Sequence, residues 1–380
     1  MKKNIYILSA SDRFNYGDLL FPILVKGELS QRGDYDFLNI ATVKSDFSEV
    51  GALPTYSFRS LYNKKNGGIL FIAGGEVLCA NWSRLLSFLD ARYFEVYQRF
   101  DGSPWLEFLA MLLCGKAANP LPFVPSDPVL SEKYSVFYNA VGGVGVSESP
   151  LRDVVEKALS EAVYVSLREG RTFKEVSSGL GVSKARLSPD SAILVSNHYA
   201  SCKNFSDERY VVFQVGRYKL GASLLTIKKE LEGISRYFGC PVYLMPIGNC
   251  PGHEDNVPLK WLVENLNCPS KYIEPSSLSR IVEVISGAEL FLGTSLHGVI
   301  TAMSFNVPYV GLNPRVRKLD AYLKAWAPEP LSEVVAINDA LEMAIKAMSI
   351  DKNELLASSS MQKRLASESF DIVHRLIQDI

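Results

Sequence analysis

The stretch over residues 293–302, GTSLHGVITA, holds the residue types best suited to chemistry. An apolar run ends at Gly293, small hydroxyl residues follow, and His297 and Gly298 open an amphipathic helix. The free N–H groups and positive dipole end of such a helix start would receive an anion. A histidine at this place can act as a general acid or as a phosphate ligand. Capping or packing is the alternative role for His297, and the order of strand, glycine, hydroxyl residue and helix favours the functional one.

A second candidate lies between the first expected strand and a helix expected over residues 19–29. It consists of Asn15, Tyr16, Gly17 and Asp18. In an open parallel sheet, the loop after a strand's carboxyl end faces the ligand crevice. Asp18 is expected at or near the N-cap of the helix, so it can orient a ligand or can simply cap.

A third candidate is Arg168, at the end of the apolar run 162–169, together with Asp190. The planar guanidinium of arginine can grip a carboxylate or phosphate in a way that lysine cannot copy. The alternative for Arg168 is a solvated surface loop. Asp190 follows Pro189, and this favours a structural role in a turn or as an N-cap.

The elements that position these residues alternate between strands and helices. Short runs rich in β-branched and aromatic residues end in glycine-rich turns, and helix-period segments follow them, which is typical of an α/β protein with parallel sheets. A polar stretch over 196–209 separates two such series. The sequence therefore predicts two Rossmann-like domains in tandem, 1–200 and 201–350, and a helical tail over 351–380 that packs back on the first domain. The expected strands lie in the runs 5–10, 68–75, 135–143, 162–169, 210–216, 240–248, 288–295 and 307–312.

Composition narrows the class of protein. The 380 residues carry 40 Lys and Arg against 41 Asp and Glu, a net charge of -1, so nucleic acid is not an expected partner. The longest apolar run, 104–115, is shorter than the roughly 20 residues of a membrane span, so we expect a buried helix there and no transmembrane segment. The chain start resembles a strand more than a secretory signal. Six scattered cysteines without a CxxC pair favour reduced thiols, a cytoplasmic location and no metal site. The usual ATP and nicotinamide motifs are missing, so no cofactor is expected.

Several short motifs follow one another in a specific order. They are Asn15, Gly17 and Asp18; Gly74, Gly75 and Glu76; Gly143, Val144, Gly145 and Val146; Ser166, Leu167, Arg168 and Glu169; Asp190 and Ser191; and Ser295, Leu296, His297 and Gly298, with Val307 and Pro308 beyond them. This ordered set resembles the polysaccharide pyruvyl transferase family over roughly residues 5–320. Three positions depart from the family pattern: Glu76 replaces a glycine, Val146 a proline and Ser295 an arginine.

The resemblance implies a fold similar to the two-domain GT-B glycosyltransferases, with an anion site in the crevice between the domains. It implies transfer of the enolpyruvyl group of phosphoenolpyruvate to a sugar as a pyruvate ketal, with release of phosphate. His297 would then act as acid or phosphate ligand, Arg168 would hold the donor anion, and Asp18 would orient the acceptor hydroxyl or act as base. In place of the arginine absent at Ser295, the charge would come from Arg217, Arg315, Arg317 or Lys318. Substrate-binding positions would be Asn15, Gly17, Gly74, Gly75, Gly143, Gly145, Arg217, Ser295, Leu296, Gly298, Arg317 and Lys318.

Two other functions stay open at this point. A GT-B glycosyltransferase that uses a nucleotide sugar would share the architecture and the glycine-rich strand ends. A non-catalytic relative that acts in polysaccharide assembly would account for the departures at Glu76, Val146 and Ser295. The expected partners are phosphoenolpyruvate and a sugar acceptor. Lipid linkage of the acceptor and contact with the inner face of the membrane are left open.

Overall fold

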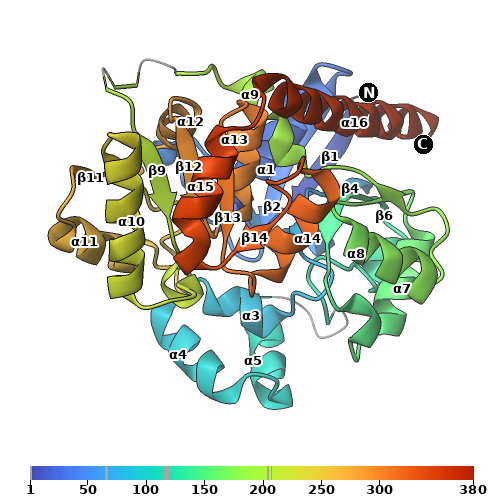
Figure 1. The fold of residues 1–380 in the computed structure, drawn as a ribbon. Helices are drawn as coiled ribbons and strands as arrows, with labels where there is room; N and C mark the ends of the chain where they lie inside the picture. The colour runs from blue at the N-terminus through green and yellow to red at the C-terminus, as the bar shows by residue number, and fades with distance from the viewer. Residues whose placement is uncertain (1, 65–66, 115–119, 203–204, 207) are drawn as a thin grey trace. The chain divides into compact units, whose positions relative to one another are not determined.

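The computed structural model describes residues 2–64, 67–114, 120–202, 205–206 and 208–380 (Figure 1). The chain forms two compact units. Unit 1 comprises Met1–Ser191, Cys250–Gly252 and Leu365–Ile380, and unit 2 comprises Ala192–Asn249 and His253–Arg364. The chain first passes from unit 1 to unit 2 at residue 192, and the last residues of the expected tail belong to unit 1.

Unit 1 is built on a parallel sheet with strand order β3-β2-β1-β4-β6-β7-β8, and a short β5 pairs with β6. The four apolar runs expected in this half form β1, β4, β6 and β7. The strands are β1 (Lys3–Leu8), β2 (Tyr35–Ala41), β3 (Tyr56–Ser57), β4 (Gly68–Ile72), β5 (Gly75–Glu76), β6 (Tyr134–Gly142), β7 (Tyr164–Leu167) and β8 (Arg186–Leu187).

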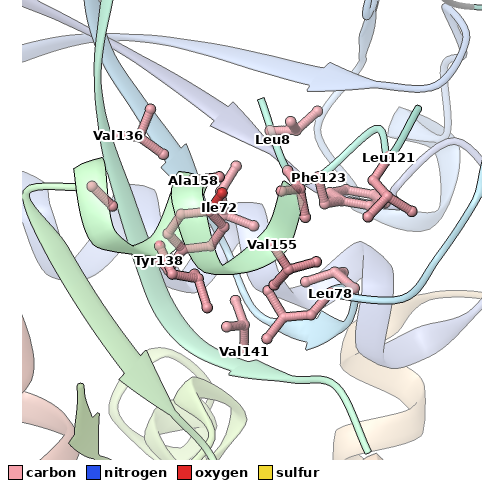
Figure 2. Close-up of a cluster of buried hydrophobic side chains, with 14 of the residues drawn as sticks. Leu8, Ile72, Leu78, Leu121, Phe123, Val136, Tyr138, Val141, Val155 and Ala158 are labelled. Carbon is pink, nitrogen blue, oxygen red and sulfur yellow. The ribbon is translucent and has the colours of Figure 1, made fainter. Parts of the chain in front are cut away.

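Helices cover both faces of this sheet because alternate strand residues point to opposite sides. Figure 2 shows one face, where Leu8, Ile72 and Tyr138 meet Val155 and Ala158 of α7 (Arg152–Glu161). On the other face, Phe71 stacks on Phe370 of α16 (Lys352–Asp379) at 6.3 Å between ring centroids. Helix α1 (Tyr16–Ser30) lies beside α16. Just after the end of α1, Arg32 Nε donates a hydrogen bond to Asp371 Oδ1 of α16 at 2.7 Å.

The helices of unit 1 differ in length, and capping residues set several of their boundaries. The stretch around 83–100 divides into α3 (Trp82–Ser87) and α4 (Ala91–Phe100), because Asp90 caps a new helix by accepting from the Tyr93 N–H at 2.8 Å. Helix α7 begins two residues after Pro150. The tail is one long helix, α16. The other helices of unit 1 are α2 (Ser60–Asn63), α5 (Pro104–Cys114), α6 (Pro128–Ser131) and α8 (Gly170–Lys174).

Unit 2 repeats the plan with a second parallel sheet, in the order β11-β10-β9-β12-β13-β14. Helix α10 contacts both α11 and α15, and α13 contacts both α12 and α14. The strands are β9 (Val211–Gln214), β10 (Val242–Leu244), β11 (Ser270–Tyr272), β12 (Leu290–Gly293), β13 (Tyr309–Leu312) and β14 (Val334–Val335). The helices are α9 (Val195–His198), α10 (Leu224–Phe238), α11 (Asn256–Asn265), α12 (Leu278–Ser286), α13 (Leu296–Ser304), α14 (Arg317–Trp326) and α15 (Ala340–Met348).

Each sheet reverses its strand order once, and this fixes where a ligand can enter. In unit 1 the reversal lies between β1 and β4, and in unit 2 between β9 and β12. Loops that leave adjacent strands at such a point turn to opposite faces and open a crevice at the carboxyl edge of the sheet. The two-domain α/β fold expected from the sequence is confirmed, and most of the candidate residues follow these carboxyl ends.

Candidate functional site

The reversal point of unit 2 brings Arg217 and the Ser295–Gly298 motif to one sheet edge. Arg217 follows β9, and Ser295 and His297 follow β12, which is hydrogen-bonded to β9. Between the two strand ends, the Gly216 N–H donates to Thr294 Oγ1 at 3.4 Å. Arg217 and Ser295 are about eighty positions apart in the sequence, and the parallel pairing of β9 with β12 brings them to the same edge.

The start of α13 has the geometry expected for an anion-receiving helix end. Ser295 is its N-cap, in extended backbone conformation, and its hydroxyl accepts from the Gly298 N–H at 3.3 Å. Gly298 has no room for a side chain, because a Cβ there would lie 2.5 Å from the Phe291 ring. The Ser295 hydroxyl thus satisfies one of the N–H groups that the first turn leaves without an intrahelical acceptor. The positive end of the helix dipole lies at this turn, at the sheet edge.

His297 lies in the first turn of α13 and is buried, with 6% of its surface exposed. Its carbonyl accepts from Thr301 Oγ1 at 2.7 Å, one helical turn on. Leu296, also predicted as a site residue, is buried beside it. The imidazole is therefore held on a rigid element at the reversal point, and only a small part of it reaches solvent.

A buried carboxylate that sequence reasoning missed lies under the same edge. Asp255 accepts from Gln214 Nε2 at 2.7 Å and from the N–H groups of Ile247 and Gly248, both at 3.1 Å. Gln214 is the last residue of β9, and its Oε1 atom is buried without a hydrogen-bond partner among the described residues. Burial raises the pKa of Asp255 from 3.8 to about 6, against the opposing effect of these hydrogen bonds. The only sequence signal for this site was the polar loop that contains His253 and Asp255.

This raised pKa predicts how stability depends on pH. Between pH 3.8 and about 6 the folded protein keeps a proton on Asp255 that the unfolded chain has released. The free energy of unfolding therefore falls as pH rises through this window, by an amount on the order of 3 kcal/mol, and levels off above it. Asp255→Asn should remove this fall, as measured by urea unfolding at a series of pH values. Glu264→Gln, at an exposed carboxylate on α11, should keep the wild-type slope, and an unchanged slope in Asp255→Asn would contradict the assignment.

The basic residues proposed to replace the missing arginine are spread along this edge. The Arg217 side chain is half exposed and pairs with Glu254 at 3.2 Å. Arg317 and Lys318 begin α14, after β13, which pairs with β12. Arg315 and Arg317 are exposed. These cations therefore follow β9 and β13, the two strands that pair with β12 on either side.

In unit 1, the Asn15–Asp18 motif opens α1 after β1, and Asp18 lies near the N-cap as expected. Asn15, not Asp18, is the N-cap residue, and its side chain accepts no capping hydrogen bond. Instead Asn15 Nδ2 donates to Asp18 Oδ2 at 2.8 Å. Asp18 lies in the first turn, where its charge complements the helix dipole. Gly17 is buried in the same turn.

The glycines predicted as binding residues follow β4 and β6. Gly74 and Gly75 have φ of 108° and 90°, and a Cβ at Gly74 would lie 2.8 Å from Phe21 of α1. Gly145 has φ of 91°, and a Cβ at Gly143 would lie 2.6 Å from Leu78. Left-handed backbone and close approach to side chains explain glycine at these four positions.

Arg168 directly follows β7 and is fully buried, so it is not part of a solvated loop. Its Nη1 donates to Asp190 Oδ2 at 3.0 Å and its Nη2 to Glu76 Oε2 at 2.6 Å. Burial alone would lower the pKa of Arg168, but the two carboxylates outweigh it and raise that pKa. Asp190 is itself buried, and its structural role is to bind the Arg168 guanidinium, which differs from the turn or N-cap role expected for it. Glu76 is the partner that sequence reasoning did not assign.

Helix α5 contradicts the expectation of an ordinary buried helix. Along one side, at the spacing i, i+3, i+4, i+7, i+8, its side chains are between 41% and 58% exposed. The opposite side is anchored, since Leu106 and Ala110 are buried and Glu107 accepts from the N–H groups of Trp82 and Ser83. Among the described residues, no helix has the length and apolarity to cross a bilayer. The exposed residues, which we call the α5 face, are Trp105, Phe108, Leu109, Leu112 and Leu113.

Comparisons with known proteins address both the family and the fold. A family model described as polysaccharide pyruvyl transferase matches residues 15–315. No curated protein matches the chain. The solved UDP-GlcNAc 2-epimerase of Methanocaldococcus jannaschii, in complex with UDP-GlcNAc and UDP, is 13% identical, with a TM-score of 0.55 over 96% of this chain and 98% of that chain.

Two further solved structures have a similar likeness. A putative UDP-N-acetylglucosamine 2-epimerase from Listeria monocytogenes is 11% identical, with a TM-score of 0.56 over 100% of this chain and 96% of that chain. An alpha-glucosyltransferase in complex with UDP and DNA is 10% identical, with a TM-score of 0.55 over the whole of both chains. At such identities the likeness shows the GT-B-like fold alone.

Proposed function

Because the chain belongs to the polysaccharide pyruvyl transferase family, we propose that it transfers the enolpyruvyl group of phosphoenolpyruvate to a sugar as a pyruvate ketal. One sugar hydroxyl adds to C2 of the donor while a proton reaches the C3 methylene, which becomes a methyl group. A second hydroxyl then attacks C2, the bond from C2 to the phosphate oxygen breaks, and phosphate leaves with the remaining proton. The reaction needs anion recognition and proton transfer, and it calls for no metal or cofactor.

The observation that carries the proposal is the Ser295–Gly298 motif at the reversal point of unit 2. The motif lies within the family match and opens α13 at the carboxyl edge of the sheet. Donor phosphate or carboxylate would lie against the first turn of α13, since N–H groups and the dipole favour an anion there. Arg217, Arg317 and Lys318 would add positive charge. His297 would protonate C3 or bind the phosphate.

The acceptor would bind at the corresponding edge of unit 1. Asn15 and Asp18 offer amide and carboxylate groups after β1, and Gly74 and Gly75 keep the backbone open after the adjacent β4. Asp18 would orient or deprotonate a sugar hydroxyl. The donor-binding role expected for Arg168, Gly143 and Gly145 stays a prediction, because carboxylates of the chain already bind Arg168 and the Gly145 N–H.

A ligand titration separates this function from its alternatives. Thermal unfolding would be followed against phosphoenolpyruvate and against a set of UDP-sugars. We expect phosphoenolpyruvate to raise the melting temperature, since a ligand at 100 times its Kd adds about 2.7 kcal/mol to the free energy of unfolding. Stabilisation by a UDP-sugar alone would favour a glycosyltransferase. A folded protein that responds to neither would favour a non-catalytic relative.

The α5 face favours contact with a membrane surface, which would bring the protein to a lipid-linked acceptor. An uninterrupted row of Trp, Phe and Leu on one side of a helix is typical of segments that lie in the headgroup region of a bilayer. Phe100 of α4 extends the row, since its ring meets Trp105 edge to face at 5.7 Å between centroids.

A negative charge introduced on the α5 face should weaken membrane binding. Phe108→Glu and Leu112→Glu should each lower co-sedimentation with phosphatidylcholine and phosphatidylglycerol vesicles by about tenfold, because each removes part of the apolar area that enters the bilayer. Gln98→Glu adds the same charge at an exposed polar position of α4 and serves as the matched control. Equal sedimentation of all three variants and the wild-type protein would reject the membrane proposal.

A further inference from the structure

The carboxyl edge of unit 1 contains a set of groups suited to an anion, and the chain's own side chains already bind them. These groups are the Arg168 guanidinium and the N–H groups of the turn Gly143–Gly145. The Gly143 N–H donates to Thr172 Oγ1 at 3.3 Å, the Val144 N–H to Glu76 Oε1 at 2.7 Å, and the Gly145 N–H to Glu175 Oε2 at 2.8 Å. Successive N–H groups of a turn, together with an arginine, are a common way to bind phosphate. We call Arg168 and this turn the Arg168 cluster.

Glu76 is the side chain that holds the cluster together. One of its oxygens accepts from Val144, and the other accepts from Arg168 at 2.6 Å. Gly142 leaves room for this ion pair because it has no side chain. A Cβ at this position would lie 2.5 Å from Glu76 Oε2 and 2.8 Å from Arg168 Nε. The carboxylate therefore lies in a fitted position between a strand end and a turn.

The charges of the cluster also disfavour a second anion. Arg168 contributes one positive charge, while Glu76 and Asp190 each contribute one negative charge at contact distance. Glu175 adds another carboxylate at the same turn, and Arg171 pairs with it at 3.1 Å, so the carboxylates still outnumber the guanidinium groups by one. An incoming phosphate would meet donors that are already bound, inside a region whose net charge is negative.

We propose that Glu76 is a resident anion that fills the Arg168 cluster and makes this edge of unit 1 select a neutral, hydroxyl-bearing ligand over a phosphate-bearing one. Its side chain is 26% exposed, so it can still accept a hydrogen bond from a hydroxyl group outside the cluster. The identification of that ligand as the sugar acceptor rests on the proposed function. The exclusion of phosphate by Glu76 does not.

The test is whether removal of Glu76 creates a phosphate site. Isothermal titration with inorganic phosphate would compare the wild-type protein, Glu76→Gly, Glu76→Gln and the control Glu148→Gln, an exposed carboxylate next to the same turn. We expect Glu76→Gly to bind one more phosphate than the wild-type protein, with an affinity at the Arg168 cluster raised roughly a hundredfold or more. Without Glu76, Arg168 Nη2 and the Val144 N–H lose this acceptor, and the charges of Arg168 and Arg171 balance those of Asp190 and Glu175. Glu148→Gln should match the wild-type protein.

The number of sites separates the two proposals. A wild-type protein that binds no phosphate would count against the donor site in unit 2, yet Glu76→Gly would still gain a site. If Glu76→Gly is poorly folded, a rise in its melting temperature with phosphate reports the same site. Glu76→Gln is the milder change, because it removes the charge and keeps one oxygen that can accept from Arg168 or from the Val144 N–H. Equal phosphate binding by Glu76→Gly, Glu76→Gln and the wild-type protein would overturn the inference.

Discussion

Replacement of His297 by alanine is expected to lower pyruvyl transfer by about 10²–10⁴-fold, the usual contribution of a general acid or base. The imidazole is held in the first turn of α13, at the edge where Arg217 also lies. It is the titratable side chain within the Ser295–Gly298 motif, so its loss removes the proposed proton donor to C3 or the phosphate ligand. The measurement is phosphate release from phosphoenolpyruvate in the presence of acceptor.

The control for this prediction separates chemistry from stability. Removing a buried imidazole also removes packing, so His297→Ala will lose some stability. Ser277→Ala removes the N-cap hydroxyl of α12 in the same unit, which accepts from the Arg280 N–H at 3.1 Å, at a cost of about 1 kcal/mol. This variant should keep full transfer. Undiminished phosphate release by a folded His297→Ala protein would remove His297 from the mechanism.

The sequence predicted the central strands well and the edge strands poorly, for one physical reason. Strands β4 and β12 are buried on both faces, so their apolar runs stand out from the surrounding sequence. Strand β2 lies next to the edge strand β3, and its polar residues Asp36 and Asn39 interrupt its apolar run. The edge strands β8 and β14 are only two residues long. Such strands form because a neighbouring strand offers hydrogen bonds, and a single segment of sequence carries no trace of that neighbour.

The same distinction applies to the site. Glycine, hydroxyl and charged residues after apolar runs predicted which positions lie at the sheet edges, since strand ends are local features. The partner of each residue is not local: Glu76 and Arg168 are ninety-two positions apart, and Gln214 and Asp255 forty-one. The α5 face shows a second limit of prediction from sequence, which concerns burial. Apolar spacing predicts a helix with an apolar side, but only the fold decides whether anything covers it.

Replacement of Arg168 by methionine is expected to lower the free energy of unfolding by about 3–5 kcal/mol, because it leaves charged partners without a counter-charge. Asp190 is fully buried and Glu76 mostly so. Urea unfolding at neutral pH measures this loss.

The matched control is Arg152→Met, because Arg152 pairs with Asp153 at 3.5 Å on the surface and should change stability by less than about 1 kcal/mol. The double variant Arg168→Met with Asp190→Asn should recover part of the loss, since it removes the more deeply buried of the two charges. A stability of Arg168→Met within 1 kcal/mol of the wild-type protein would contradict the double ion pair. A large loss would show that the guanidinium joins the ends of β5, β7 and β8. Any loss of transfer in that variant must then be separated from loss of fold before Arg168 is given a place in the chemistry.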